Sequence, residues 1–257
     1  MSEPRRRPGR FRRGASILPS LFTVANLFFG FWAVIKTVHG QFGEAAPFIG
    51  LAIVLDLLDG QIARLTGTSS EFGGELDSLA DAISFGVAPA LLAYSWGLAV
   101  AGRPGWLAAF LFVTCGTLRL ARFNVQRQAV DSRYFVGLPI PAAAACLAAW
   151  VNFAPAGLAR REVAFGAAAV TVALGLLMVS TFRYHSFKKV DLRSRRSYRA
   201  LVVIALLFLL VAHDPPRVLL AAATAYALSG PVLYLWRLAR RRREPVGVGQ
   251  AQTTTGA

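Results

Sequence analysis

Residues 56–81 read DLLDGQIARLTGTSSEFGGELDSLAD, and this stretch decides the fold of the chain. It holds six of the thirteen acidic residues and lies between two strongly apolar segments. Asp56 and Asp59 are three positions apart, and Asp77 and Asp81 are four apart, so each pair projects from one face of a helix. Because charge within membrane-type helices is costly, such residues are usually kept for function.

The run between the two aspartate pairs predicts a turn. Gly67, Gly73 and Gly74, with neighbouring Thr and Ser residues, indicate a break between two apolar helices. A short break folds the second helix back antiparallel to the first, which brings the four aspartates to one end of the pair. Carboxylate oxygens suit hard divalent cations, so the sequence predicts a site for Mg²⁺, Ca²⁺ or Mn²⁺. The alternative is that these acids pair with arginines and only hold helices together.

Three residues beside the first aspartate pair favour a bound phosphate compound. Gly60 and Ala63 leave the adjacent helix face bare, so a flat or bulky ligand can approach the backbone. Arg64 adds a positive, forked group of the kind that binds phosphate.

The composition predicts an all-α polytopic membrane protein. Of 257 residues, 55% are hydrophobic and 16% are charged, and the mean hydropathy is +0.50. Apolar runs of about 20 residues recur, each long enough to cross about 30 Å of hydrocarbon. We expect about eight spans, a six-helix core plus two, at about residues 18–37, 46–65, 76–100, 104–124, 138–156, 163–182, 198–213 and 217–237.

These spans form one membrane domain, residues 17–238, in the predicted organisation. A basic N-terminal arm, residues 1–16, and a basic and polar C-terminal tail, residues 239–257, flank it and are expected to be disordered.

The basic residues predict the orientation in the membrane. The net charge is +15, and with eight spans 23 of the 28 Lys and Arg residues fall on the side that holds both termini. The positive-inside rule places this side, and with it the four aspartates, in the cytoplasm. We expect the membrane to be a bacterial-type plasma (inner) membrane. The same charges attract anionic membrane lipids. No nucleic-acid partner is expected, because the basic residues lie at the ends of the membrane spans.

Several other polar residues in or near the spans have two interpretations each. Asn26 needs a hydrogen-bond partner, either on another helix or in the ligand site. Arg119 and Arg122 are one turn apart and either extend to the membrane surface or clamp a carboxylate or phosphate. Arg183 and Lys188 either set the topology or hold an anionic acceptor or a lipid diphosphate.

The positions around the aspartates form one pattern, Asp56-x2-Asp59-Gly60-x2-Ala63-Arg64-x8-Gly73-x3-Asp77-x3-Asp81. This pattern resembles the signature of the CDP-alcohol phosphotransferase family. The stretches LPSLFTVANLFFGF, RLARFN, YFVGLPIPAAA, STFRYHSFK and SGPVLYL resemble its phosphatidylserine synthase branch, from about residue 17 to residue 236. One departure is Ser20, where that branch is expected to have asparagine.

The resemblance implies transfer of a phosphatidyl group from CDP-diacylglycerol to the hydroxyl of L-serine, giving phosphatidylserine and CMP. It implies two divalent cations, Mg²⁺ or Mn²⁺, on the four aspartates, with Asp81 also acting as general base. The implied nucleotide pocket consists of Asp56, Gly60, Ala63, Arg64, Gly73 and Asp77. The candidates for acceptor binding are Arg119, Arg122, Arg183 and Lys188. A homodimer is also implied.

Two other functions remain open at this point. A related enzyme of the family would use glycerol 3-phosphate or an inositol phosphate as acceptor, and the basic residues of 183–196 would favour such phosphates. An ion-coupled transporter would carry buried carboxylates too, but is expected to show repeated halves and acids near the middle of the bilayer.

Overall fold

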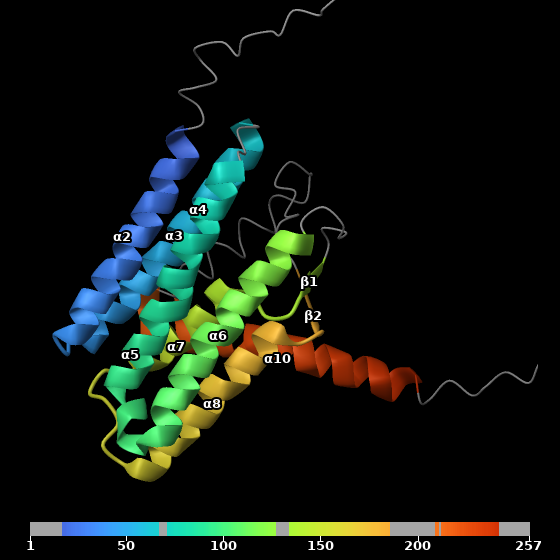
Figure 1. The fold of residues 1–257 in the computed structure, drawn as a ribbon. Helices are drawn as coiled ribbons and strands as arrows, with labels where there is room; N and C mark the ends of the chain where they lie inside the picture. The colour runs from blue at the N-terminus through green and yellow to red at the C-terminus, as the bar shows by residue number, and fades with distance from the viewer. Residues whose placement is uncertain (1–16, 67–70, 127–133, 186–208, 211, 242–257) are drawn as a thin grey trace, which may run out of the picture.

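The computed structural model describes residues 17–66, 71–126, 134–185, 209–210 and 212–241, which form a bundle of helices (Figure 1). The first helices are α2 (Ile17–Val38), α3 (Phe42–Thr66), and α4 (Glu71–Asp81), which continues into η1 (Ala82–Val87) and α5 (Ala88–Trp96). A 3-10 turn, η2 (Leu98–Ala101), leads into α6 (Arg103–Gln126). The later helices are α7 (Ile140–Phe153), α8 (Arg161–Val179) and α10 (Pro215–Arg241).

Within the described part of the chain, six helices are long and apolar enough to cross a membrane: α2, α3, the continuous helix from α4 to α5, α6, α8 and α10. The shorter apolar helix α7 coincides with a seventh predicted span. The prediction of an all-α polytopic membrane protein is therefore confirmed. The predicted span 198–213 lies mostly outside the described residues, as do the arm 1–16 and most of the tail 239–257.

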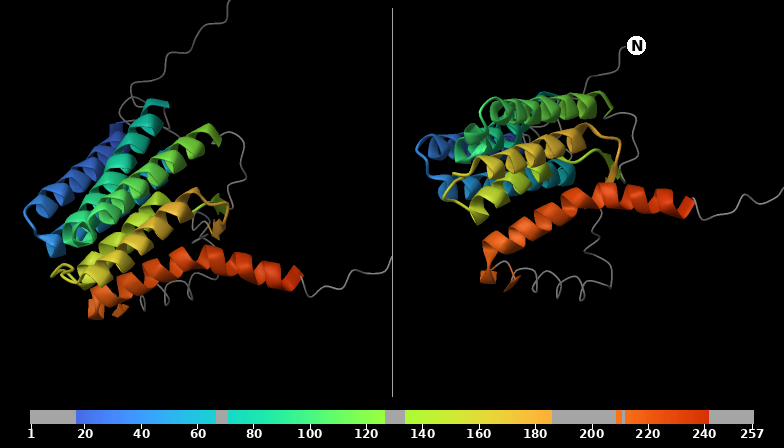
Figure 2. Two further views of the ribbon diagram at one scale, coloured as in Figure 1. Left: turned by 60° about the horizontal axis from the view of Figure 1, so that its bottom comes forward. Right: turned by 90° about the horizontal axis from the view of Figure 1, so that it is seen from below.

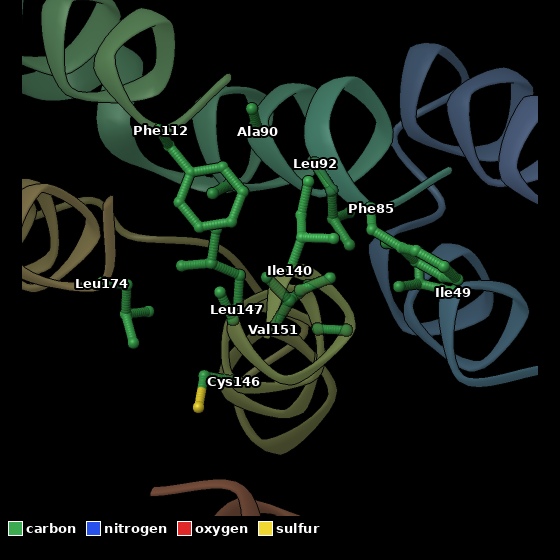
Figure 3. Close-up of a cluster of buried hydrophobic side chains, with 14 of the residues drawn as sticks. Ile49, Phe85, Ala90, Leu92, Phe112, Ile140, Cys146, Leu147, Val151 and Leu174 are labelled. Atoms are coloured by element: carbon green, nitrogen blue, oxygen red, sulfur yellow. The ribbon is translucent and has the colours of Figure 1, made fainter. Parts of the chain in front are cut away.

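The centre of the bundle is α7, whose side chains meet those of the surrounding helices (Figure 3). Ile140 and Val151 are fully buried, together with Phe85 of η1 and Phe112 of α6. The alanine-rich sequence of α7 lets the neighbouring helices approach closely. Helix α10 lies against α7 on the outside of the bundle, and its C-terminal end extends past the other helices (Figure 2).

The helix that carries Asp77 and Asp81 changes its winding directly after Asp81. Residues Ala82–Val87 form a π-helix, and α-helical winding resumes at Ala88 with Pro89 in the first turn. Proline has no N–H, and its ring clashes with the carbonyl four residues earlier in an α-helix. The wider π turn accommodates Pro89 without ending the helix.

The sequence-based position of the turn before this helix was wrong. Gly73 and Gly74 lie inside α4, which already begins at Glu71. An acidic residue in the first turn stabilises a helix through the helix dipole, and this favours the earlier start. Gly67, the remaining glycine of the predicted turn, lies outside the described residues.

A two-stranded antiparallel sheet, which the sequence did not predict, lies beside α10 (Figure 1). It consists of β1 (Tyr134–Val136) and β2 (Arg183–His185). Gly137 follows β1 with a φ of 81°, a left-handed conformation that favours glycine, and its N–H donates to the Phe182 carbonyl at 2.8 Å. The chain turns there into α7.

Tyr184 of β2 attaches this sheet to α10. Its side chain is fully buried, its hydroxyl donates to the Ala227 carbonyl at 2.9 Å, and its ring lies against the backbone of Gly230. Burial raises the pKa of Tyr184 from about 10 to about 12, so the hydroxyl keeps its proton, and can donate, to a higher pH than a free tyrosine.

Candidate functional site

Three of the four aspartates of the sequence pattern come together at one end of the bundle. Asp56 and Asp59 lie on α3 and Asp77 lies on α4, and one carboxylate oxygen of each is within 4.8 Å of the other two. Asp59 is buried, and the other two are half-buried. Three carboxylates at this spacing repel one another, and a hard divalent cation removes that repulsion by binding oxygens of all three. The donor set therefore fits a hard divalent cation such as Mg²⁺, Ca²⁺ or Mn²⁺.

Asp81 lies close to this set of three carboxylates but outside it. It is 8% exposed and interacts electrostatically with Asp56, Asp77 and Asp59. The structure thus places all four aspartates in one site, with three of them at ligand spacing and the fourth beside them.

Helix α2 supplies a hydrogen-bond donor to each of two aspartates. Thr23 Oγ1 donates to Asp59 Oδ2 at 3.1 Å, and Asn26 Nδ2 donates to Asp81 Oδ1 at 3.3 Å. The sequence indicated that Asn26 needs a partner, whereas Thr23 was missed. The signal was present, because Thr23 lies three residues before Asn26 and shares its face of an otherwise apolar helix.

Arg119 of α6 faces the same site, whereas Arg122 has a separate partner. Arg119 is 9% exposed and interacts electrostatically with Asp81 and with Tyr226 of α10. Its Nε has no hydrogen-bond partner among the described residues. Arg122 is half-buried, and its Nη1 donates to the Val179 carbonyl at the end of α8, at 3.5 Å. Of these two arginines, Arg119 is therefore the one whose charge interacts with an aspartate of the site, Asp81.

A further link, also missed in the sequence, fixes α4 against α6. Asn124 Nδ2 donates to Ser78 Oγ at 2.9 Å, and Ser78 Oγ in turn donates to the Gly74 carbonyl at 3.0 Å. Ser78 is the neighbour of Asp77, so this link holds the backbone that carries Asp77. Asn124 is the last residue of the RLARFN stretch, which stood out in the sequence only for its resemblance to a known family. That stretch could have pointed to Asn124.

The other predicted site residues are placed only in part. Gly60 follows Asp59 on α3, and Gly73 lies one turn before Asp77 on α4. Ala63 and Arg64 belong to the last turn of α3 and Arg183 to β2, but the structure does not describe their side chains. Lys188 lies outside the described residues. The roles of all these residues stay predictions.

Comparison with known proteins gives one family and several similar relatives. A family model described as CDP-alcohol phosphatidyltransferase matches residues 16–180. Over 198 residues the chain is 39% identical to the CDP-diacylglycerol–serine O-phosphatidyltransferase of Helicobacter pylori, covering 75% of this chain and 81% of the relative. The enzyme of the same name from Bacillus subtilis is 36% identical over 173 residues, which are 67% of this chain and 92% of the relative. The enzyme of the same name from Methanocaldococcus jannaschii is 36% identical over 165 residues, which are 64% of this chain and 72% of the relative.

Proposed function

Because the chain belongs to the CDP-alcohol phosphatidyltransferase family, we propose that it transfers the phosphatidyl group of CDP-diacylglycerol to L-serine, forming phosphatidylserine and CMP. The observation that carries this proposal is the group of ligand-spaced carboxylates, Asp56, Asp59 and Asp77, with Asp81 beside them. The acceptor follows from the relatives in three organisms that are named for serine.

Asp56, Asp59 and Asp77 would hold the divalent cation. If two cations are bound, Asp81 would be the fourth carboxylate ligand. Mg²⁺ and Mn²⁺ are the cations that we propose for these oxygen ligands. When bound, such cations neutralise a diphosphate and stabilise charge on the attacking and leaving oxygens.

Asp81 is the proposed general base. It takes the proton of the serine hydroxyl as that oxygen forms a bond to the lipid-side phosphorus, and the bond from this phosphorus to the CMP oxygen breaks. A carboxylate with an ordinary pKa of about 3.9 is a weak base. Correct placement of Asp81 beside the acceptor must therefore supply much of its contribution.

Arg119 is the proposed partner of the serine carboxylate. It brings a buried positive charge close to Asp81, and its Nε has no hydrogen-bond partner among the described residues. A guanidinium binds a carboxylate through two parallel hydrogen bonds, which orients the bound amino acid. Arg122, Arg183 and Lys188 remain further candidates for anionic groups of the substrates.

The nucleotide is assigned to the acidic end of α3 and α4. Gly60 and Ala63 would leave room for it beside α3, Gly73 would do so on α4, and Arg64 would neutralise a phosphate. Asp56 and Asp77 would border the same space.

We also propose that the site and both termini face the cytoplasm at a bacterial-type plasma membrane, and that the protein is a homodimer. Lys36 lies in the last turn of α2, Arg103 begins α6, and Arg160 precedes α8, all away from the aspartate end of the antiparallel bundle. In the proposed orientation most of the other Lys and Arg residues would lie on the aspartate side, as the positive-inside rule requires of a cytoplasmic face.

The test is a comparison of acceptors with the purified full-length protein. CDP-diacylglycerol and Mn²⁺ are supplied with labelled L-serine, glycerol 3-phosphate or an inositol phosphate, and CMP release and lipid product are measured. We expect phosphatidylserine with serine and no lipid product with the two phosphates. Product with glycerol 3-phosphate but not with serine would keep the family chemistry and refute the proposed acceptor.

A further inference from the structure

One face of α2 is polar where it meets the aspartates, although the helix as a whole is apolar. Thr23, Asn26 and Gly30 are buried on this face, whereas Val24 and Phe28 are exposed on the outside of the bundle. Burial of a hydroxyl or amide in apolar surroundings is unfavourable unless it is hydrogen-bonded. The Thr23 hydroxyl and the Asn26 amide nitrogen meet this requirement by donating to an aspartate.

The two hydrogen bonds go to aspartates in different positions. Thr23 contacts Asp59, which belongs to the ligand-spaced set, and Asn26 contacts Asp81, which lies outside that set. The bond from Thr23 is made to Oδ2 of Asp59, and the bond from Asn26 is made to Oδ1 of Asp81. Two adjacent residues of one helix face thus act on two parts of the site.

Asn26 is itself held in place by the π-helical segment. Ser84 Oγ of η1 donates to the backbone carbonyl of Asn26 at 3.1 Å. One turn further along α2, a Cβ on Gly30 would lie 2.7 Å from the Cα of Ser84, so glycine permits this close approach of the two backbones. The contact fixes α2 against the segment that directly follows Asp81.

The orientation of the Asn26 amide follows from its surroundings. Its nitrogen faces the Asp81 carboxylate, while its oxygen is buried and has no hydrogen-bond partner among the described residues. The reverse orientation would set two acceptor oxygens against each other. The amide therefore serves Asp81 as a donor.

We infer that Thr23 and Asn26 are positioning residues of the transfer reaction, with Thr23 orienting Asp59 as a cation ligand and Asn26 orienting Asp81 toward the acceptor hydroxyl. This inference rests on the proposed function for the role of Asp81, whereas the role of Thr23 concerns cation binding alone. Neither residue belongs to the aspartate pattern of the sequence.

The experiment compares Thr23→Val and Asn26→Leu, which remove the donors and keep the branching of each side chain, with the matched control Thr37→Val. Thr37 is buried on the same helix, but its hydroxyl donates to the Ala33 carbonyl of α2 itself, at 2.8 Å. Mn²⁺ binding is measured by electron paramagnetic resonance on the purified protein without substrate. The kcat and KM for serine are measured at saturating Mn²⁺ and CDP-diacylglycerol.

Thr23→Val is expected to weaken Mn²⁺ binding about 10- to 100-fold, as is usual when a residue that orients a metal ligand is lost. Thr23→Ser, which keeps the hydroxyl, restores the binding. Asn26→Leu is expected to lower kcat about 10- to 100-fold, with a smaller effect on Mn²⁺ affinity and on the serine KM. If Asn26→Leu does not fold, as judged by gel filtration, Asn26→Ala removes the same donor with a smaller side chain.

The inference is overturned if both variants behave like Thr37→Val, or if each lowers Mn²⁺ affinity and kcat to the same extent. Failure of the proposed function looks different, because wild-type protein would then form no phosphatidylserine. In that case a loss of Mn²⁺ binding in Thr23→Val would still establish its action on Asp59.

Discussion

Replacement of Arg119 by methionine tests the acceptor side of the site. The change removes the guanidinium and keeps an unbranched side chain that fills most of the same space. Arg119 is 9% exposed, and within the described part of the chain no hydrogen bond or ion pair is formed by its Nε. If its partner is the serine carboxylate, the variant loses substrate contacts while the protein loses few of its own.

The expected size of the effect follows from the type of bond. A hydrogen bond to a charged group contributes about 1.5–3 kcal/mol. At about 1.4 kcal/mol per factor of ten, the loss of one such bond raises the serine KM about 10- to 150-fold. The melting temperature should be unchanged or higher, because the variant removes the unfavourable desolvation of a buried guanidinium.

The assay measures initial rates of CMP release with serine varied at saturating CDP-diacylglycerol, and then with the lipid varied at saturating serine. Arg122→Met is the comparison variant, because Arg122 lies one turn away, donates to the Val179 carbonyl and is itself a candidate for an anionic group of the substrates. A larger rise in the serine KM in Arg122→Met than in Arg119→Met would assign the serine carboxylate to Arg122. Arg119→Lys keeps the charge without the fork and should fall between wild type and Arg119→Met. A rise in the CDP-diacylglycerol KM with an unchanged serine KM would refute the assignment and move Arg119 to the diphosphate.

Three further outcomes are expected. Asp81→Asn should lower kcat about 10²- to 10⁴-fold, the usual contribution of a general base, while Mn²⁺ still binds to the purified protein; normal turnover would remove Asp81 as the base. Chelation by EDTA should stop CMP release and added Mg²⁺ or Mn²⁺ should restore it, whereas activity in metal-free buffer would contradict a cation at Asp56, Asp59 and Asp77. Tyr184→Phe should lower the melting temperature, because the buried Ala227 carbonyl loses its donor at a cost of about 1–3 kcal/mol. Since the pKa of Tyr184 is about 12 in the folded protein and about 10 when unfolded, its protonated hydroxyl stabilises the fold below pH 10 and this contribution is lost between about pH 10 and 12. The difference in melting temperature between wild type and Tyr184→Phe should shrink over that range, and a constant difference would contradict the assignment.

The sequence predicts much of this molecule because its strongest patterns are local. Apolar runs of sufficient length predict the spans, and the spacing within each aspartate pair predicts a shared helix face. Antiparallel neighbours then bring Asp56 and Asp59 close to Asp77. Each of these steps depends on the geometry of one helix or of two consecutive helices, and for this reason composition and spacing are sufficient.

The features that the sequence did not predict depend on contacts between distant segments. The β1–β2 pair joins residues about fifty positions apart, and neither strand is long enough to show an alternating pattern. Gly73 and Gly74 are typical of turns, yet the helix start at Glu71 includes them in α4. The distinction between Arg119 and Arg122 depends on Asp81, Tyr226 and Val179, which lie on three other elements.

The π-helical segment from Ala82 to Val87 has a consequence for how the sequence can change. A π turn takes up one more residue than an α turn, and each residue rotates an α-helix by about 100°. If the same sequence wound as a regular α-helix, the aspartate-bearing half would rotate by about this angle relative to the half that contains Leu92. The segment therefore sets the rotation of the half that carries Asp77 and Asp81 relative to the half that packs in the core. A one-residue insertion or deletion within it would turn the aspartates to a new direction without replacing any of them.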